Sequence, residues 1–162
     1  MKKKKTSRTY KVLSGVKPDA VVVYCSDPRF QTTFRKFTEG EIGLAEGKYI
    51  PFVVAGGAGA LARPETMPKE FKFMRRRLEL FINDFISIRR IILINHEDCA
   101  YYRDLSKKAL GAAKKGRHLA RTDLKKIAEI FRKILAFPVR IELYYARFAN
   151  RNRTLVTFEE VK

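Results

Sequence analysis

Short apolar runs and stretches of helical periodicity alternate along most of the chain. Three runs, at residues 19–25, 49–55 and 90–95, are almost continuously apolar and rich in β-branched residues, which is typical of strands buried on both faces of a parallel sheet. A fourth run at 139–145 alternates more and is expected nearer an edge. Residues 154–159 can return beside it as a hairpin after an Asn-Arg-Asn-Arg turn.

Between these runs, apolar residues recur three and four positions apart, which is the spacing of one helix face. The pattern predicts one helix over about residues 66–87 and a second that begins at the candidate N-cap Thr122 and ends before Pro138. Strands that alternate with helices favour a single α/β domain, with a mainly parallel β-sheet flanked by helices and an edge hairpin near the C-terminus. The two helical patterns are carried by Phe71, Met74, Leu78, Phe81 and Phe85, and by Leu124, Ile127, Phe131 and Ile134.

The chain divides into a short arm and one domain. Residues 1–18 are polar and basic and are expected to form a flexible arm, and residues 19–162 are expected to form the α/β domain. A hydrophobic share of 46% excludes a disordered chain. No apolar run approaches the roughly 20 residues that span a bilayer, and no apolar core follows the basic start. A cytoplasmic protein without membrane contact is therefore expected.

The formal net charge is +18, from 35 basic and 17 acidic residues. A field of this sign attracts anions and nucleic acid without specificity. Residues 103–133 are strongly basic, so dedicated nucleic-acid binding is a hypothesis from outside the enzymes. The sequence contains no recognised nucleic-acid module, however, and only non-specific binding of nucleic acid is expected.

The residues with the strongest chemical implication lie just after two of the predicted strands. Cys25 ends the first strand, and His96 and Cys99 follow the third. Because ligands of an open parallel sheet bind at the carboxyl ends of its strands, two thiolates and one imidazole are expected in one crevice. Such a Cys₂His set with an open fourth position suits Zn²⁺. A redox disulfide and a pair of inert buried thiols are the alternatives.

These residues resemble the pattern of a known family. Cys25-x-Asp27-x-Arg29 after the first strand, with His96-x-x-Cys99 roughly seventy residues later, is similar to the β-class carbonic anhydrases. The resemblance implies that Cys25, His96 and Cys99 bind zinc and that Asp27 and Arg29 form a catalytic dyad. It also implies a carbonate dehydratase-type lyase that reversibly hydrates carbon dioxide to bicarbonate through a zinc-bound hydroxide. A homodimer or a higher even oligomer is expected for the same reason.

The resemblance covers roughly residues 19–145 and is that of a short, divergent member. The family usually has an Arg-Asn-Ala-Gly stretch after the second strand, where this chain has a glycine-rich loop. Ala100-Tyr101-Tyr102 stands after the last ligand, where a second glycine is common in the family. Backbone N–H groups of the loop are expected to receive the substrate anion, and a tight strand-to-helix turn is the alternative. The loop residues are Gly56, Gly57, Ala58 and Gly59.

Asp27 and Arg29 have a role that also follows from their chemistry. Zinc lowers the pKa of a bound water to about 7, and the Asp27 carboxylate can accept the proton of the resulting hydroxide. Arg29 can keep Asp27 ionised and oriented through a bidentate pair. Asp27 can instead coordinate the metal itself. The Arg29-paired arrangement is favoured, because a third anionic ligand would make the site negative and discourage capture of bicarbonate.

Other functions and contacts stay open at this point. One alternative is a zinc hydrolase of carbonyl sulfide or carbon disulfide. Another is a non-catalytic zinc protein whose basic surface binds anions or nucleic acid. Phe30, Phe34 and Phe37 are spaced as one helix face after the dyad, and this stripe either forms a subunit contact or packs inside its own chain.

Overall fold

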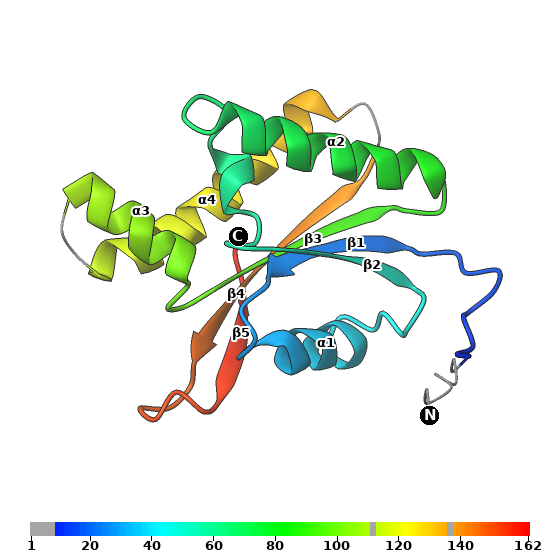
Figure 1. Cartoon of the computed structure of the whole chain (residues 1–162), viewed down its shortest axis with the longest axis horizontal. Helices are drawn as coiled ribbons and strands as arrows, with labels where there is room; N and C mark the ends of the chain where they lie inside the picture. The colour runs from blue at the N-terminus through cyan, green and yellow to red at the C-terminus, as the bar shows by residue number, and fades with distance from the viewer. Residues whose placement is uncertain (1–8, 111–112, 136–137) are drawn as a thin grey trace, which may run out of the picture.

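Five strands form one sheet in the spatial order β2-β1-β3-β4-β5 (Figure 1). The computed structural model describes residues 9–110, 113–135 and 138–162, without the side chains of 106–110 and 113–116. Strands β1 to β4 are parallel, and β5 runs antiparallel to β4. All five predicted strands and the C-terminal hairpin are confirmed. The bounds are β1 Ala20–Cys25, β2 Tyr49–Val54, β3 Arg90–His96, β4 Arg140–Phe148 and β5 Val156–Glu160.

The helices follow the predicted pattern with one exception. Helix α2 confirms the helix expected over 66–87. The next predicted helix begins earlier than expected, because α4 starts at Ala113 and Thr122 therefore lies inside it rather than at its N-cap. Residues 113–121 are rich in Ala, Lys and Arg, which favour a helix, and Gly116 costs only about 1 kcal/mol. The bounds are α1 Gln31–Gly40, the 3₁₀ turn η1 Gly59–Ala62, α2 Pro68–Asp84, α3 Ala100–Leu110 and α4 Ala113–Ile134.

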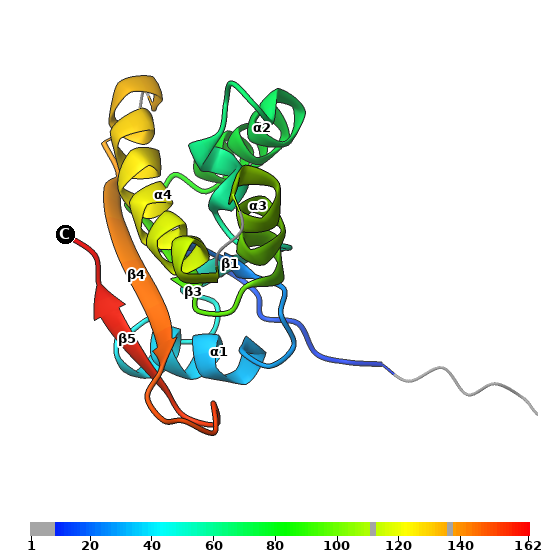
Figure 2. The same ribbon diagram turned by 90° about the vertical axis from the view of Figure 1, so that its left-hand side faces the viewer.

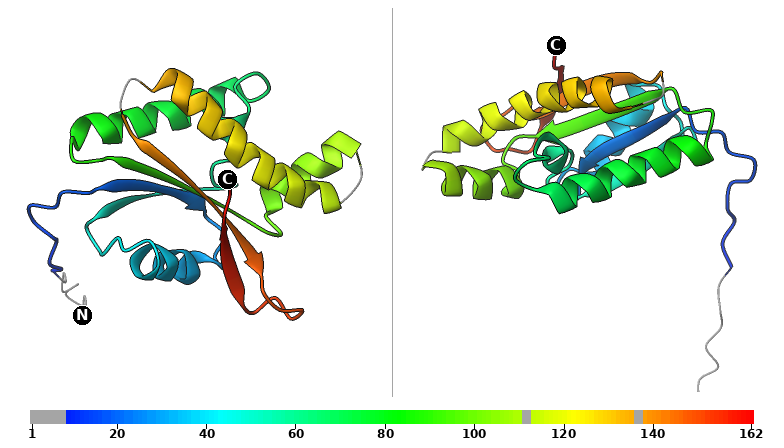
Figure 3. Two further views of the ribbon diagram at one scale, coloured as in Figure 1. Left: turned by 180° about the vertical axis from the view of Figure 1, so that it is seen from behind. Right: turned by 90° about the horizontal axis from the view of Figure 1, so that it is seen from above.

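Helices cover both faces of the sheet (Figures 2 and 3). Helix α1 packs on the face that includes Val22 and Ile94, whereas α2 and α4 cover the opposite face through Leu78, Leu124 and Phe131. Strand β1 is buried along its whole length, and β3 is buried after its first residue. This burial is the reason for their continuous apolar sequence. Helix α3 lies beside α4 at the carboxyl ends of the parallel strands (Figure 2).

The described residues before β1 form a mostly exposed segment without regular secondary structure. Residues 9–17 are exposed and contain neither helix nor strand. Residues 1–8 of the predicted basic arm lie outside the described residues, and the flexibility of the arm stays a prediction. In the part of the chain that the structure describes, no helix combines the length and apolarity needed to cross a membrane.

The phenylalanine stripe packs inside its own chain. Phe30, Phe34 and Phe37 are all buried beneath α1. The Phe37 ring stacks on Phe158 of β5 with 3.8 Å between centroids, and the Phe34 ring lies 5.1 Å from Tyr24 of β1. The stripe therefore joins α1 to the sheet, and the alternative in which it forms a subunit contact is wrong.

Replacing Phe34 with Ala should destabilise the chain without changing its assembly. The side chain is fully buried, so the free energy of unfolding measured in urea should fall by about 3–5 kcal/mol. The half-exposed Phe73 of α2 provides the control, and Phe73→Ala should cost less than about 1 kcal/mol. Equal costs, or a change in the light-scattering mass of Phe34→Ala, would contradict this assignment of the stripe.

Candidate metal centre

The parallel pairing of β1 and β3 brings the three predicted ligands together. Cys25 is the last residue of β1 and His96 is the last residue of β3, its neighbour in the sheet. Cys99 follows a short turn after β3 and immediately precedes α3. The three side chains therefore meet at the carboxyl edge of the sheet, where open α/β folds bind their ligands.

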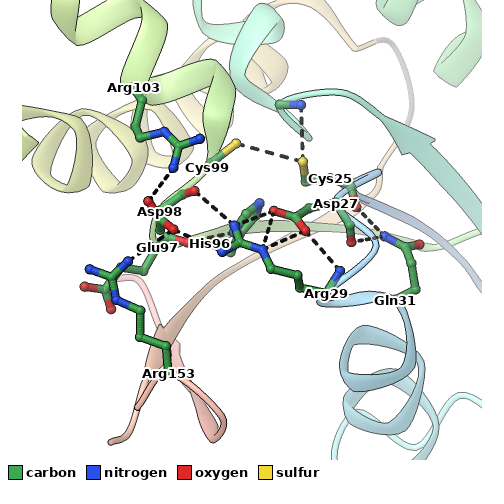
Figure 4. Close-up of polar contacts among 11 residues, drawn as sticks. Cys25, Asp27, Arg29, Gln31, His96, Glu97, Asp98, Cys99, Arg103 and Arg153 are labelled. Atoms are coloured by element: carbon green, nitrogen blue, oxygen red, sulfur yellow. Dashed lines mark hydrogen bonds and ion pairs between the residues drawn. The ribbon is translucent and has the colours of Figure 1, made fainter. Parts of the chain in front are cut away.

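The ligand atoms are close enough to hold one metal ion. The Sγ atoms of Cys25 and Cys99 are 3.9 Å apart, and all three candidate ligand atoms lie within 4.8 Å of one another. Cys25, His96 and Cys99 are buried, with at most 6% of each residue exposed (Figure 4). The predicted juxtaposition of two thiols and one imidazole is confirmed.

The imidazole of His96 has one nitrogen engaged and one without a partner. Its Nδ1 lies 2.8 Å from the carbonyl oxygen of Glu97, and a carbonyl only accepts, so Nδ1 carries the hydrogen. Its Nε2 is buried and has no hydrogen-bond partner among the described residues. An acceptor buried without a partner is costly. A metal ion held by Nε2 and the two sulfurs would satisfy it, and the Nδ1 contact is the outer-shell bond typical of metal-binding histidines.

The two thiols differ in how readily they lose a proton. The hydrogen bond with Cys99 lowers the pKa of Cys25 against the opposing effect of burial, and the same contact together with burial raises the pKa of Cys99. The backbone N–H of Gly56 donates to the Cys25 Sγ over 3.3 Å. Thiols must lose their protons to bind a metal, and a divalent cation held between the two sulfurs would take the place of those protons.

Asp27 and Arg29 form a bidentate ion pair beside this centre (Figure 4). Arg29 donates from Nε to Asp27 Oδ1 over 3.1 Å and from Nη2 to Oδ2 over 2.7 Å, and its backbone N–H donates to Oδ1 over 3.0 Å. These bonds hold the pKa of Asp27 below its usual value. Asp27 is not part of the group of close ligand atoms. Gln31 holds the intervening backbone by donating to the carbonyls of Cys25 and Asp27.

Asp98 supports the pair from the other side. Its carboxylate accepts from Arg29 Nη1 over 3.1 Å and from Arg103 Nη1 over 2.8 Å. Burial raises the pKa of Asp98, but these guanidinium contacts outweigh it and leave the pKa lowered. Its backbone has φ +60°. This conformation is uncommon outside Gly, and Asp is one of the residues that adopt it more often than others. The sequence offers one signal for the role of Asp98, which is its position between the ligands His96 and Cys99. It offers no signal for the hydrogen bonds that Gln31 donates.

The sequence matches no protein-family model and no curated protein. Solved structures do match it. The carbonic anhydrase of Streptococcus mutans is 19% identical over 94% of this chain and 88% of that protein, with a TM-score of 0.54. The β-carbonic anhydrases CafD and CafA of Aspergillus fumigatus are each 12% identical with TM-scores of 0.53, and cover 96% and 91% of this chain and 95% and 78% of their own.

The chain has the fold of the β-carbonic anhydrases. The resemblance found in the sequence is thereby confirmed for the architecture, which spans almost the whole described chain. Two places where this chain departs from the family pattern are the glycine-rich loop after β2 and the tyrosines after Cys99.

The glycine-rich loop is a tight turn whose backbone donors face inward. Gly56 donates to the Cys25 sulfur, Gly57 to the carbonyl of Val54, and Gly59 to the carbonyl of Gly56. These contacts favour the structural alternative for the loop. Contact of Gly56–Gly59 with a substrate anion stays a prediction.

The two departures from the family pattern fit each other in space. A Cβ at Gly56 would lie 2.5 Å from the Tyr101 ring, and one at Gly59 would lie 2.4 Å from it. Both distances are shorter than any real Cβ contact. The Tyr101 ring therefore occupies the space that the glycines leave, which accounts for the joint presence of the loop and the tyrosine.

Replacing Gly59 with Ala should cost about 1–3 kcal/mol through overpacking against Tyr101. In the Tyr101→Ala background the same change should cost much less, because the ring it meets is gone. Gly40→Ala at the end of α1 is the control, since a Cβ there meets nothing within 4 Å. Thermal unfolding of the four variants checks this, and strictly additive costs would contradict the packing argument.

Proposed function

We propose that this protein binds one Zn²⁺ per chain through Cys25, His96 and Cys99 and reversibly hydrates carbon dioxide to bicarbonate. The observation that carries the proposal is the buried ligand set, with its unpartnered His96 Nε2, directly beside the Asp27–Arg29 pair. Three protein ligands leave a fourth zinc position for water or substrate. A purely structural zinc site has no use for such an oriented carboxylate.

The fold adds independent support. The three solved structures compared above, with TM-scores of 0.53 and 0.54, are carbonic anhydrases from one bacterium and one fungus. Their likeness to this chain extends over more than nine tenths of its length. Fold alone does not decide chemistry, so the proposal depends on the side chains at the carboxyl edge of the sheet.

Each residue of the centre has a defined task in this reaction. When bound to such a set, zinc supplies a nucleophile at neutral pH by lowering the pKa of a coordinated water. Asp27, kept ionised by Arg29, would accept a hydrogen bond from that nucleophile. This bond would orient the nucleophile so that a lone pair of its oxygen faces carbon dioxide. Arg29 keeps the carboxylate oriented through the bidentate pair, and Asp98 holds the guanidinium on its other side.

The same contacts support a site that stays open to substrate. To coordinate the metal, Asp27 would have to leave the four hydrogen bonds that Arg29 donates from its backbone N–H, Nε and Nη2. Charge-assisted bonds of this kind are stronger than neutral ones. A third anionic ligand would also make the centre negative and disfavour bicarbonate.

The proposal includes assembly as a homodimer or a higher even oligomer. It also places the protein in the reducing cytoplasm, because both ligand thiols must stay reduced. Light scattering at micromolar concentration should give twice the chain mass of 18.8 kDa or an even multiple. A particle of single-chain mass would contradict the assembly without bearing on the zinc site.

Asp27→Asn should abolish catalysis while zinc stays bound. The amide has the shape of the carboxylate but carries no charge, and its NH2 group cannot accept from Arg29, so the bidentate pair that orients the site is lost. Stopped-flow hydration of carbon dioxide should therefore slow by about 10²–10⁴-fold. The half-exposed Asp19, whose carboxylate lies 3.9 Å from Lys48 Nζ, gives the control Asp19→Asn, which should keep full activity. Undiminished hydration by zinc-loaded Asp27→Asn would refute the role of the dyad.

His96→Ala should remove most of the bound zinc. The chain has only two histidines, and His118 is exposed on α4, so His118→Ala is a matched control that should retain one zinc per chain. Metal analysis after dialysis measures both. Equal zinc content in the two variants would overturn the ligand assignment.

A further inference from the structure

A polar pocket lies along the 96–99 turn that carries two of the candidate metal ligands. Its volume is about 110 Å³. The candidate metal ligands His96 and Cys99 line it together with Tyr102, whereas Cys25, Asp27 and Arg29 do not. We call it the arginine pocket, and its other lining residues are Glu97, Asp98, Arg103, Arg117, Tyr145 and Arg153.

Three guanidinium groups reach this pocket from three different elements. Arg103 comes from α3, Arg117 from α4, and Arg153 from the turn between β4 and β5. Figure 4 shows Arg103 and Arg153 converging on Asp98 from opposite sides. Each side chain is more than half exposed, so an ion from solvent can reach all three.

Both carboxylates of the pocket already accept hydrogen bonds from arginines. Glu97 accepts from Arg117 Nη2 over 2.8 Å and from the backbone N–H of Phe148 over 3.0 Å. Asp98 accepts from Arg103 and from Arg153 Nη1 over 3.4 Å, and it also holds Arg29 outside the pocket. Two carboxylates thus face three guanidinium groups within the pocket. A guanidinium has five N–H donors, and the surplus charge is positive.

Tyr145 supplies a donor that has nothing to bind. Only 1% of the residue is exposed, and its hydroxyl has no hydrogen-bond partner within the described part of the chain. Burial raises the pKa of this hydroxyl, and the charges that act on it are Glu97 and Arg117 of the pocket together with Arg121 and Glu159. A protonated hydroxyl buried beside guanidinium groups needs an acceptor.

We propose that the arginine pocket binds one small oxyanion, of the size and charge of phosphate or bicarbonate. The guanidinium forks of Arg103, Arg117 and Arg153 match oxyanion geometry, and the Tyr145 hydroxyl donates the fourth contact. The volume holds several water molecules or one such ion, which excludes a nucleotide. The contacts that carry the inference come from these four side chains. The inference does not depend on hydration of carbon dioxide, although His96 and Cys99 of the candidate metal centre line the same pocket.

Titration of zinc-loaded protein with inorganic phosphate, at ionic strength held constant with chloride, tests this by calorimetry. Saturable binding of one phosphate per chain is expected. Arg117→Gln and the conservative Tyr145→Phe should each weaken it by about tenfold, which corresponds to about 1.4 kcal/mol. Two controls should leave it unchanged: Arg140→Gln, at the far end of β4, and Tyr144→Phe, whose hydroxyl bonds Glu142 on the opposite face.

Three results would overturn the proposal. One is the absence of saturable binding. Another is equal weakening by Arg140→Gln, which would show attraction by the overall charge and not by a site. The third is undiminished binding in both Arg117→Gln and Tyr145→Phe, which would place the anion at the metal instead. Repeating the titration with bicarbonate distinguishes the two oxyanions.

Discussion

The parallel pairing of β1 with β3 is the constraint on which the centre depends. The register sets Tyr24 beside Ile94, so the two strands end together and deliver Cys25 and His96 to the same edge. A slip of one residue would turn each side chain to the opposite face of the sheet. The register is fixed by burial on both faces, because β1 and β3 are covered by α1 on one side and by α2 and α4 on the other.

A second layer of organisation comes from arginine–carboxylate contacts in a chain with large excess positive charge. Asp98 links Arg29 of the dyad to Arg103 and Arg153 of the arginine pocket. The turn between the ligands His96 and Cys99 is therefore fixed from both sides by charge, and its positive φ at Asp98 is held in place by these bonds.

Much of this arrangement is predictable from the sequence, because it depends on local patterns. Continuous apolar runs predicted the buried strands, and the placement of Cys25, His96 and Cys99 after two of them predicted the ligand set. The start of α4 was misplaced since Thr122 has the residue type of an N-cap, although the preceding basic residues also favour a helix. The packing of Tyr101 into the space left by Gly56 and Gly59, and the convergence of arginines on Asp98, join segments far apart in the chain. No local pattern carries such long-range contacts.

X-ray absorption at the zinc edge of the metal-loaded protein tests the central claim most directly. The account predicts two sulfur ligands at about 2.3 Å, from Cys25 and Cys99, and nitrogen or oxygen ligands at about 2.0–2.2 Å that include the imidazole of His96. A zinc ion surrounded only by nitrogen and oxygen, or bound by a single sulfur, would contradict it.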